Sequence, residues 1–180
     1  MARSSELDSL KTWFAYNAYA RRRYLDVLAT LPPEELSRDR GASYPTILDI
    51  FTHTLDGIAL WTRKLSVLHG TLKPPEERPD NPTVPELRTL NEEMEKVVDD
   101  LLSHLTEEDL DKTYFLPKMP PWWDDDYNAP VRATLCHLIE HELQHRGELN
   151  ALLWQIDVEP PIIDFLFDGL TGPDSKPPWA

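Results

Sequence analysis

The amino-acid sequence predicts an all-α protein: a four-helix bundle with a long loop between its third and fourth helices and a short C-terminal element. Two observations support this fold class. Four stretches repeat apolar residues at the three- and four-residue spacing of a helix face, and the alternation typical of strands is almost absent. The 180 residues suit a single domain, with the bundle at about 5–157 and a C-terminal extension at 158–180.

Capping residues and prolines delimit the four predicted helices. They are expected at about 5–31, 45–69, 83–105 and 128–157. Ser4 or Ser5 can cap the first helix, Ser43 or Tyr44 the second, and Thr83 the third. These residues place a side-chain oxygen where the first free N–H groups of each helix need an acceptor.

Two long connectors constrain the topology. The segment 71–82 holds four prolines, which predicts an extended chain. A dozen extended residues reach about 40 Å, and a 25-residue helix is about 37 Å long, so the third helix can run parallel to the second. The stretch 106–130 is expected to be the longest irregular part of the chain, apart from a short helical turn that residues 106–109 can cap. Its aromatic residues, such as Trp122 and Trp123, either roof a cleft or bury the loop against the bundle, and we favour burial.

The composition excludes several classes of function. A formal net charge of −14 argues against binding to nucleic acid or to anionic membrane surfaces. No apolar run approaches the roughly 18 residues that span a membrane. The first residues also lack the apolar core of a signal peptide, so a cytoplasmic protein is expected. The single cysteine, Cys136, rules out an internal disulfide.

Half of the six histidines lie on the predicted last helix, at a spacing of four residues. On a helical wheel His141 and His145 point toward the apolar face, while His137 lies at its margin. Two imidazoles at i and i+4 can bind one divalent transition metal, such as zinc, nickel, copper or iron. A third ligand must come from elsewhere. The candidate is His53, at the edge of the second helix's apolar face, where Gly57 leaves space beside its imidazole.

Three further polar residues fall near the predicted site. Asn17 and Arg21 lie on the apolar stripe of the first helix. Arg21 can reach out to solvent while Asn17 bonds a neighbouring helix, or both can face the pocket. Glu142, next to His141, is the candidate catalytic residue, which would orient a metal ligand or act as a base.

Residues 141–145 also spell H-E-x-x-H, the signature of zinc metalloproteases. In that interpretation Glu142 is the general base and the third ligand follows downstream, with Glu159 or Asp164 as candidates. Two observations argue against it. The extended motif fails because Glu148 stands where its glycine should be, and no predicted strands precede the helix to hold a peptide.

Four stretches of the chain together match one known family. They are Tyr16-Asn17, 43–53, Leu68-His69-Gly70 and 137–149. Through them residues 5–157 resemble the DinB/YfiT-like superfamily of metal-binding four-helix bundles. The family's last-helix pattern is His-x-x-x-His-Arg-Gly-Gln, and here Glu148 replaces the final Gln.

The resemblance implies an up-down-down-up bundle in which His53, His141 and His145 bind a divalent ion such as zinc, nickel or iron. It also implies an activity similar to that of relatives that transfer a low-molecular-weight thiol to an electrophile. Because no cysteine falls in the predicted pocket, the thiol would be a cosubstrate and the partner a small molecule. The alternative is a metal- or ligand-binding module without turnover. A homodimer is expected, with the apolar element 162–167 packing on the bundle or on a second subunit.

Overall fold

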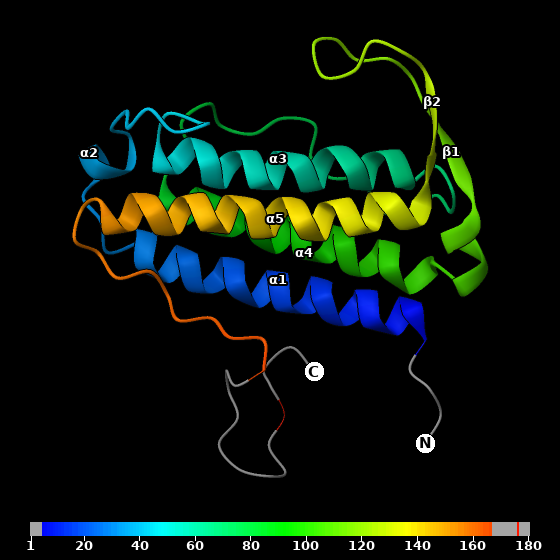
Figure 1. The fold of residues 1–180 in the computed structure, drawn as a ribbon, viewed down its shortest axis with the longest axis horizontal. Helices are drawn as coiled ribbons and strands as arrows, with labels where there is room; N and C mark the ends of the chain where they lie inside the picture. Colours follow the sequence, from blue (N-terminus) through cyan, green and yellow to red (C-terminus); the bar gives the residue numbers. More distant parts are fainter. Residues whose placement is uncertain (1–4, 167–175, 177–180) are drawn as a thin grey trace.

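The computed structural model describes residues 5–166 and 176. Four long helices dominate it, and the expected all-α bundle is confirmed (Figure 1). The long helices are α1 (Glu6–Leu28), α3 (Ile47–Leu65), α4 (Val84–His104) and α5 (Val131–Trp154). The smaller elements are α2 (Pro33–Leu36), the 3-10 helix η1 (Glu107–Asp111) and strands β1 (Thr113–Leu116) and β2 (Tyr127–Pro130).

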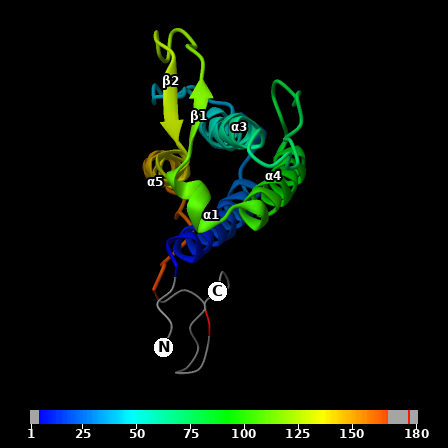
Figure 2. The same cartoon turned by 90° about the vertical axis from the view of Figure 1, so that its right-hand side faces the viewer.

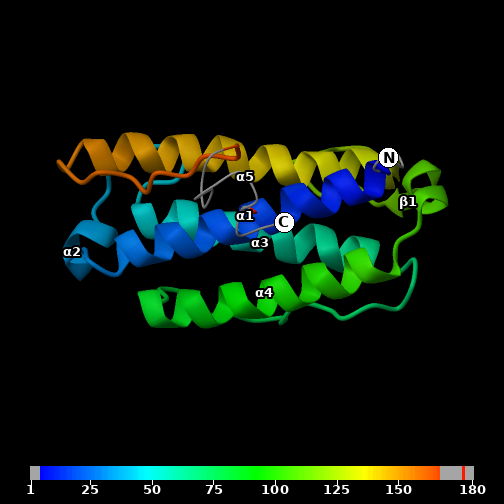
Figure 3. The same cartoon turned by 90° about the horizontal axis from the view of Figure 1, so that it is seen from below.

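The four helices form a ring in which α3 packs between α5 and α4, and α1 closes the opposite side (Figure 2). Figures 1 and 3 show α1 and α5 running in one direction and α3 and α4 in the other. Two contacts keep the carboxyl ends of α3 and α4 together. The backbone N–H of Leu72 donates to Asp100 at 2.7 Å, and the ring of His69 lies 3.0 Å from the Asp109 carboxylate. The extended connector after α3 therefore returns the chain to the far end before α4 begins.

The start of α3 differs from the prediction. Its N-cap is Thr46, not Ser43 or Tyr44, and the first helical residue is Ile47 rather than Pro45. The reason is a capping box with Asp49. The Thr46 hydroxyl accepts from the Asp49 N–H at 3.0 Å, and the Asp49 carboxylate accepts from the Thr46 N–H at 3.2 Å.

The starts of α1 and α4 agree with the prediction better than the helix ends do. Ser5 caps α1 and Thr83 caps α4, as expected. The predicted ends are too long, because α1 stops at Leu28, α3 at Leu65 and α5 at Trp154. The residues that follow form single turns closed by i to i+3 hydrogen bonds, which continue the apolar pattern without extending the helix.

The stretch 106–130 is not wholly irregular, contrary to the prediction. Strands β1 and β2 pair antiparallel, with Thr113 opposite Pro130 and Leu116 opposite Tyr127. Tyr114 and Leu116 are buried while Phe115 is exposed, so β1 does alternate. Four residues of alternation are too few to be distinguished from a loop in the sequence. The hairpin stands at the end of the bundle beside α5 and α3 (Figure 2).

The segment after α5 packs back on the bundle. Phe165 stacks on Trp13 of α1 at 4.4 Å between ring centroids and lies edge-on to Tyr16 at 5.0 Å. The apolar element therefore contacts the bundle through Phe165, as expected. Residue 167, the last of this element, lies outside the described residues. In the described part of the chain, no helix has the length and apolar character needed to cross a membrane.

Candidate metal centre

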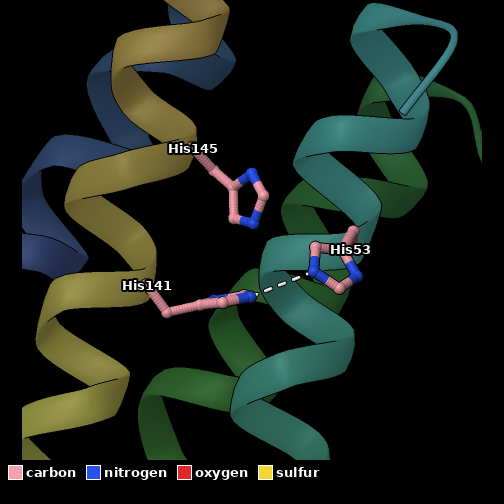
Figure 4. Close-up of side chains that lie close together, drawn as sticks. All are labelled: His53, His141 and His145. Atoms are coloured by element: carbon pink, nitrogen blue, oxygen red, sulfur yellow. Dashed lines mark hydrogen bonds between the residues drawn. The ribbon is translucent and has the colours of Figure 1, made fainter. Parts of the chain in front are cut away.

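Three histidines from two neighbouring helices converge at the interface of α3 and α5. His53 comes from α3, and His141 and His145 come from successive turns of α5 (Figure 4). One nitrogen from each ring lies within 4.8 Å of the others. The closest pair is His141 Nε2 and His53 Nε2, at 3.0 Å. The structure thus brings together the three residues that the sequence selects as ligands.

Glu148 fixes the orientation of the His145 ring. The Nδ1 atom of His145 lies 2.6 Å from a Glu148 carboxylate oxygen. An ionised carboxylate accepts hydrogen bonds and cannot donate them. Nδ1 therefore carries the hydrogen, and Nε2 keeps its lone pair for a ligand role. The residue that replaces the family's Gln still serves as a hydrogen-bond acceptor for a candidate ligand.

Gly57 of α3 makes room for the ring of His141. A Cβ atom at this position would lie 2.8 Å from His141 Cε1 and 3.2 Å from Nδ1. The sequence predicted that Gly57 leaves space beside the imidazole of His53. The structure shows that the imidazole of His141 uses this space instead. His53 and Gly57 share one helix, whereas the ring that fills the gap comes from the facing helix α5.

The electrostatics of the cluster favour neutral rings at His53 and His141. Burial first, and then the nearby rings of His145 and His53, lower the pKa of His141 to about 4. Burial and the nearby His145 also lower the pKa of His53, against the opposing effect of Asp56. Neutral imidazole is the form that donates a lone pair to a metal ion.

Aromatic rings flank the cluster on both sides. Tyr44 stacks on His53 at 4.0 Å between centroids and lies edge-on to His145 at 5.8 Å. No periodicity in the sequence pointed to Tyr44, because it lies in the coil before α3. On the other side, the exposed His137 lies 5.7 Å from His141 and stays outside the ligand group.

The loop between β1 and β2 contributes one aromatic residue near the site. Trp123 stacks on Trp61 of α3 at 5.9 Å, and Trp61 in turn lies edge-on to His137 at 5.4 Å. Trp123 therefore packs against the bundle, as we expected for this stretch. Trp122 does not, since 70% of its surface is exposed.

Arg21 and Glu142 form a buried ion pair beside the histidines. Arg21 Nη1 lies 2.6 Å from Glu142 Oε2, and Arg21 Nε donates to Asn91 Oδ1 at 2.6 Å. Arg21 therefore does not reach out to solvent. Asn17 is fully buried, and neither polar atom of its side chain has a hydrogen-bond partner among the described residues, so it does not bond a neighbouring helix. Glu142 Oε1 likewise has no partner there.

The candidate protease ligands lie apart from the histidine group. Within residues 5–166 and 176, the group of closely spaced ligand atoms consists of His53, His141 and His145 and does not include Glu159 or Asp164. The third nitrogen thus comes from upstream of the H-E-x-x-H stretch, whereas the protease interpretation needs a downstream ligand.

Comparison with known proteins identifies the family and the fold. The family model of the DinB family matches residues 3–173. The chain belongs to the DinB family. No curated protein matches it. Among solved structures, the DinB chain is similar to a DinB-like protein from Bacillus cereus ATCC 10987, with 22% identity and a TM-score of 0.58. The match covers 83% of this chain and 91% of that chain, which shows a shared fold.

The residues of this DinB protein fit a divalent transition metal. Tetrahedral zinc with bonds of about 2.0–2.1 Å to nitrogen holds its ligand atoms about 3.3–3.4 Å apart. The Nε2 atoms of His53 and His141 are 3.0 Å apart, and each of the three rings offers a nitrogen within 4.8 Å of the others, so the spacing is close to that of ligands to one ion. Three imidazoles leave a further coordination position open, which is the pattern of catalytic rather than structural sites.

Proposed function

We propose that this DinB-family protein is a metal-dependent enzyme that transfers a low-molecular-weight thiol to an electrophilic small molecule. The observation that carries the proposal is the convergence of nitrogens from His53, His141 and His145 within 4.8 Å of one another. When bound there, a divalent ion such as zinc, nickel or iron supplies Lewis acidity, which lowers the pKa of a coordinated thiol or water. The protein's part is to hold three nitrogens in place and to leave one position open.

The attacking thiol in this proposal comes from a cosubstrate. The chain's one cysteine, Cys136, is exposed and lines a surface with Trp13 of α1 and Leu143 of α5. The candidate ligands instead face α3. Cys136 therefore has no path to the site without a rearrangement of α5, and an external thiol is needed as nucleophile.

Glu142 is proposed to orient a bound group or to act as a base. Its Oε2 is occupied by Arg21 at 2.6 Å, so the proposed role depends on Oε1, which has no partner among the described residues. The ion pair holds the carboxylate in a fixed direction. The same ion pair weakens the protease interpretation, in which this residue must be free to take a proton from water.

Metal content and thiol consumption together test the proposal. The purified full chain is expected to contain about one divalent ion, and to consume glutathione in the presence of monobromobimane faster than the uncatalysed reaction. Chelation should abolish the excess rate and added zinc should restore it. His53→Ala should lose the metal and the rate, whereas His104→Ala, an exposed histidine at the end of α4, should keep both.

The other outcomes of this test separate the alternatives. Bound metal without turnover for any thiol and electrophile tested would make the protein a binding module. Metal-dependent cleavage of peptides, lost in Glu142→Gln, would support a protease. A chain that binds no divalent ion at all would remove the basis of the proposal.

A further inference from the structure

A polar cavity lies beside the candidate metal centre. It measures about 380 Å³ and is bounded by the coil before α3, the first half of α3 and the connector before α4. His53 and Tyr44 form part of its wall, and Thr52 and Asn81 add hydrogen-bonding groups. The volume falls in the range of cavities that bind small molecules.

A second, apolar cavity adjoins the first at the end of the bundle. It measures about 470 Å³, and its walls include Leu28, Leu31, Leu36 and Val84. The two cavities share four lining residues, namely Ser37, Leu48, Asn81 and Pro82. The two cavities are therefore neighbours, and a ligand lying across both would have a polar end near His53 and an apolar end between α1, α2 and α4.

The charged residues that line the polar cavity indicate which charge the polar end of a ligand should carry. Asp49, Asp56 and Asp80 line it, against a single cation, Arg78. The guanidinium of Arg78 is already held by Asp56 through two hydrogen bonds of 2.8 Å each. Among the residues that the structure describes, no other Lys or Arg lines this cavity, and its carboxylates outnumber the arginine three to one. The field there therefore favours a cationic group over a carboxylate or phosphate.

We propose that the two cavities form one binding site for a small amphipathic amine, with its ammonium group in the polar cavity and its alkyl or aryl group in the apolar one. The inference goes beyond thiol transfer, because neither binding nor its selectivity needs a metal or turnover. It also places the bound amine against the wall that carries His53, one of the three candidate ligands.

Isothermal titration of the full chain with matched probes tests the site. We expect n-octylammonium to bind at least tenfold more tightly than n-butylammonium, because each buried methylene contributes about fourfold. Octanoate, which has the same length and the opposite charge, should bind at least tenfold more weakly than n-octylammonium. Zinc-loaded and metal-free protein should both show this order.

Two pairs of variants locate the site. Leu48→Gln should reduce the preference for octyl over butyl to less than threefold, while Leu72→Gln, exposed beyond the other end of α3, should keep it. Asp80→Asn should weaken n-octylammonium at least threefold, while Asp124→Asn in the hairpin loop should not. If Leu48→Gln does not fold, Leu31→Gln tests the same apolar wall.

Three results would overturn the inference. They are equal binding of octanoate and n-octylammonium, no dependence on chain length, and an unchanged chain-length preference in the folded Leu48→Gln or Leu31→Gln variant. These results are independent of catalysis. A protein that binds n-octylammonium as described but transfers no thiol contradicts the proposed function alone, and one that transfers thiol but binds no amine contradicts this inference alone.

Discussion

At the scale of single residues, the candidate centre depends on one missing side chain as much as on three imidazoles. The ring of His141 occupies the space that a Cβ at Gly57 would take, at 2.8 Å from Cε1. Close packing in protein interiors leaves little freedom to absorb such an overlap. The residue at 57 therefore decides whether His141 can face His53.

Gly57→Ala is expected to lower zinc affinity about tenfold or more, because the new methyl group displaces the His141 ring from the position that faces His53. The melting temperature should change little, since alanine favours the helix by about 0.5–1 kcal/mol and offsets part of the clash. Competition of the protein with a zinc chelator measures the affinity.

Gly147→Ala is the matched control for this prediction. Gly147 lies in α5 like the two histidines, and a Cβ there would meet nothing within 4 Å. Its zinc affinity should equal that of the unmodified chain. Equal affinity in Gly57→Ala as well would show that the ring of His141 has another place to go, and the assigned role of Gly57 would be wrong.

The sequence was informative about these residues to different degrees. The spacing of His141 and His145 is a property of one helix, so it could be read without a fold. Selecting His53 needed the pairing of α3 with α5, which the edge position of this residue on its helix only suggested. The partner of the Gly57 gap and the stacking of Tyr44 on His53 could not be predicted, because both depend on the distance between segments far apart in the chain.

At the scale of elements, the 3-10 helix η1 anchors the hairpin to the carboxyl ends of α3 and α4. Its central group is the buried carboxylate of Asp109. This carboxylate accepts hydrogen bonds from Lys112 at 2.7 Å and from the backbone and hydroxyl of Thr106 at 2.8 Å each, and it lies 3.0 Å from the ring of His69. These donors, Lys112 first among them, hold the pKa of Asp109 far below its usual value.

Asp109→Asn should therefore change how stability depends on pH. A carboxylate whose pKa is depressed on folding stabilises the folded state above its unfolded pKa of about 3.9, and that contribution is lost as the pH falls through the lower folded value. The variant should be less stable at pH 7 by about 1–3 kcal/mol. The difference should shrink steadily below about pH 4.

Urea unfolding at several pH values between neutral and acidic measures this difference. Asp125→Asn, a change in the exposed loop between the strands, should follow the unmodified chain throughout. A difference between Asp109→Asn and the unmodified chain that stays constant down to the lowest pH would mean that Asp109 contributes through its shape rather than through its charge.

The elements also show where sequence patterns stop being sufficient. Capping boxes at α1 and α4 could be recognised because the acceptor residues and the acid three positions later lie in one local stretch. The same signature was present at Thr46 and Asp49, but Pro45 suggested an earlier start. The strands of the hairpin carry only four residues each, and their pairing across ten intervening residues is stabilised by burial of Tyr114 and Leu116.

At the scale of the whole molecule, a buried polar network joins three of the four long helices. Arg21 of α1 binds Glu142 of α5 and Asn91 of α4, and Asn91 Nδ2 donates to Glu95 at 2.7 Å. Glu142 lies between His141 and His145 in sequence, so this network and the candidate centre hold adjacent parts of the same helix. Together they fix the rotation of α5 within the bundle.

Removing one partner of the ion pair should cost more than removing both. Glu142→Leu leaves the buried guanidinium of Arg21 without its counter-ion and should destabilise the fold by about 3–5 kcal/mol. The double change Arg21→Met with Glu142→Leu replaces the pair by apolar groups and should recover most of that loss. Denaturant unfolding of the two single variants and the double variant measures the coupling.

The double variant also tests whether Glu142 takes part in the chemistry or only holds α5, because it removes the carboxylate while keeping the helix in place. Zinc affinity should stay close to that of the unmodified chain, since Glu142 is not one of the three grouped ligands. If thiol transfer also survives in a stable, zinc-bound double variant, Glu142 acts only by holding α5. If zinc stays bound and the rate falls by about 100-fold or more, the range typical of a lost general base, the free Oε1 takes part in the chemistry.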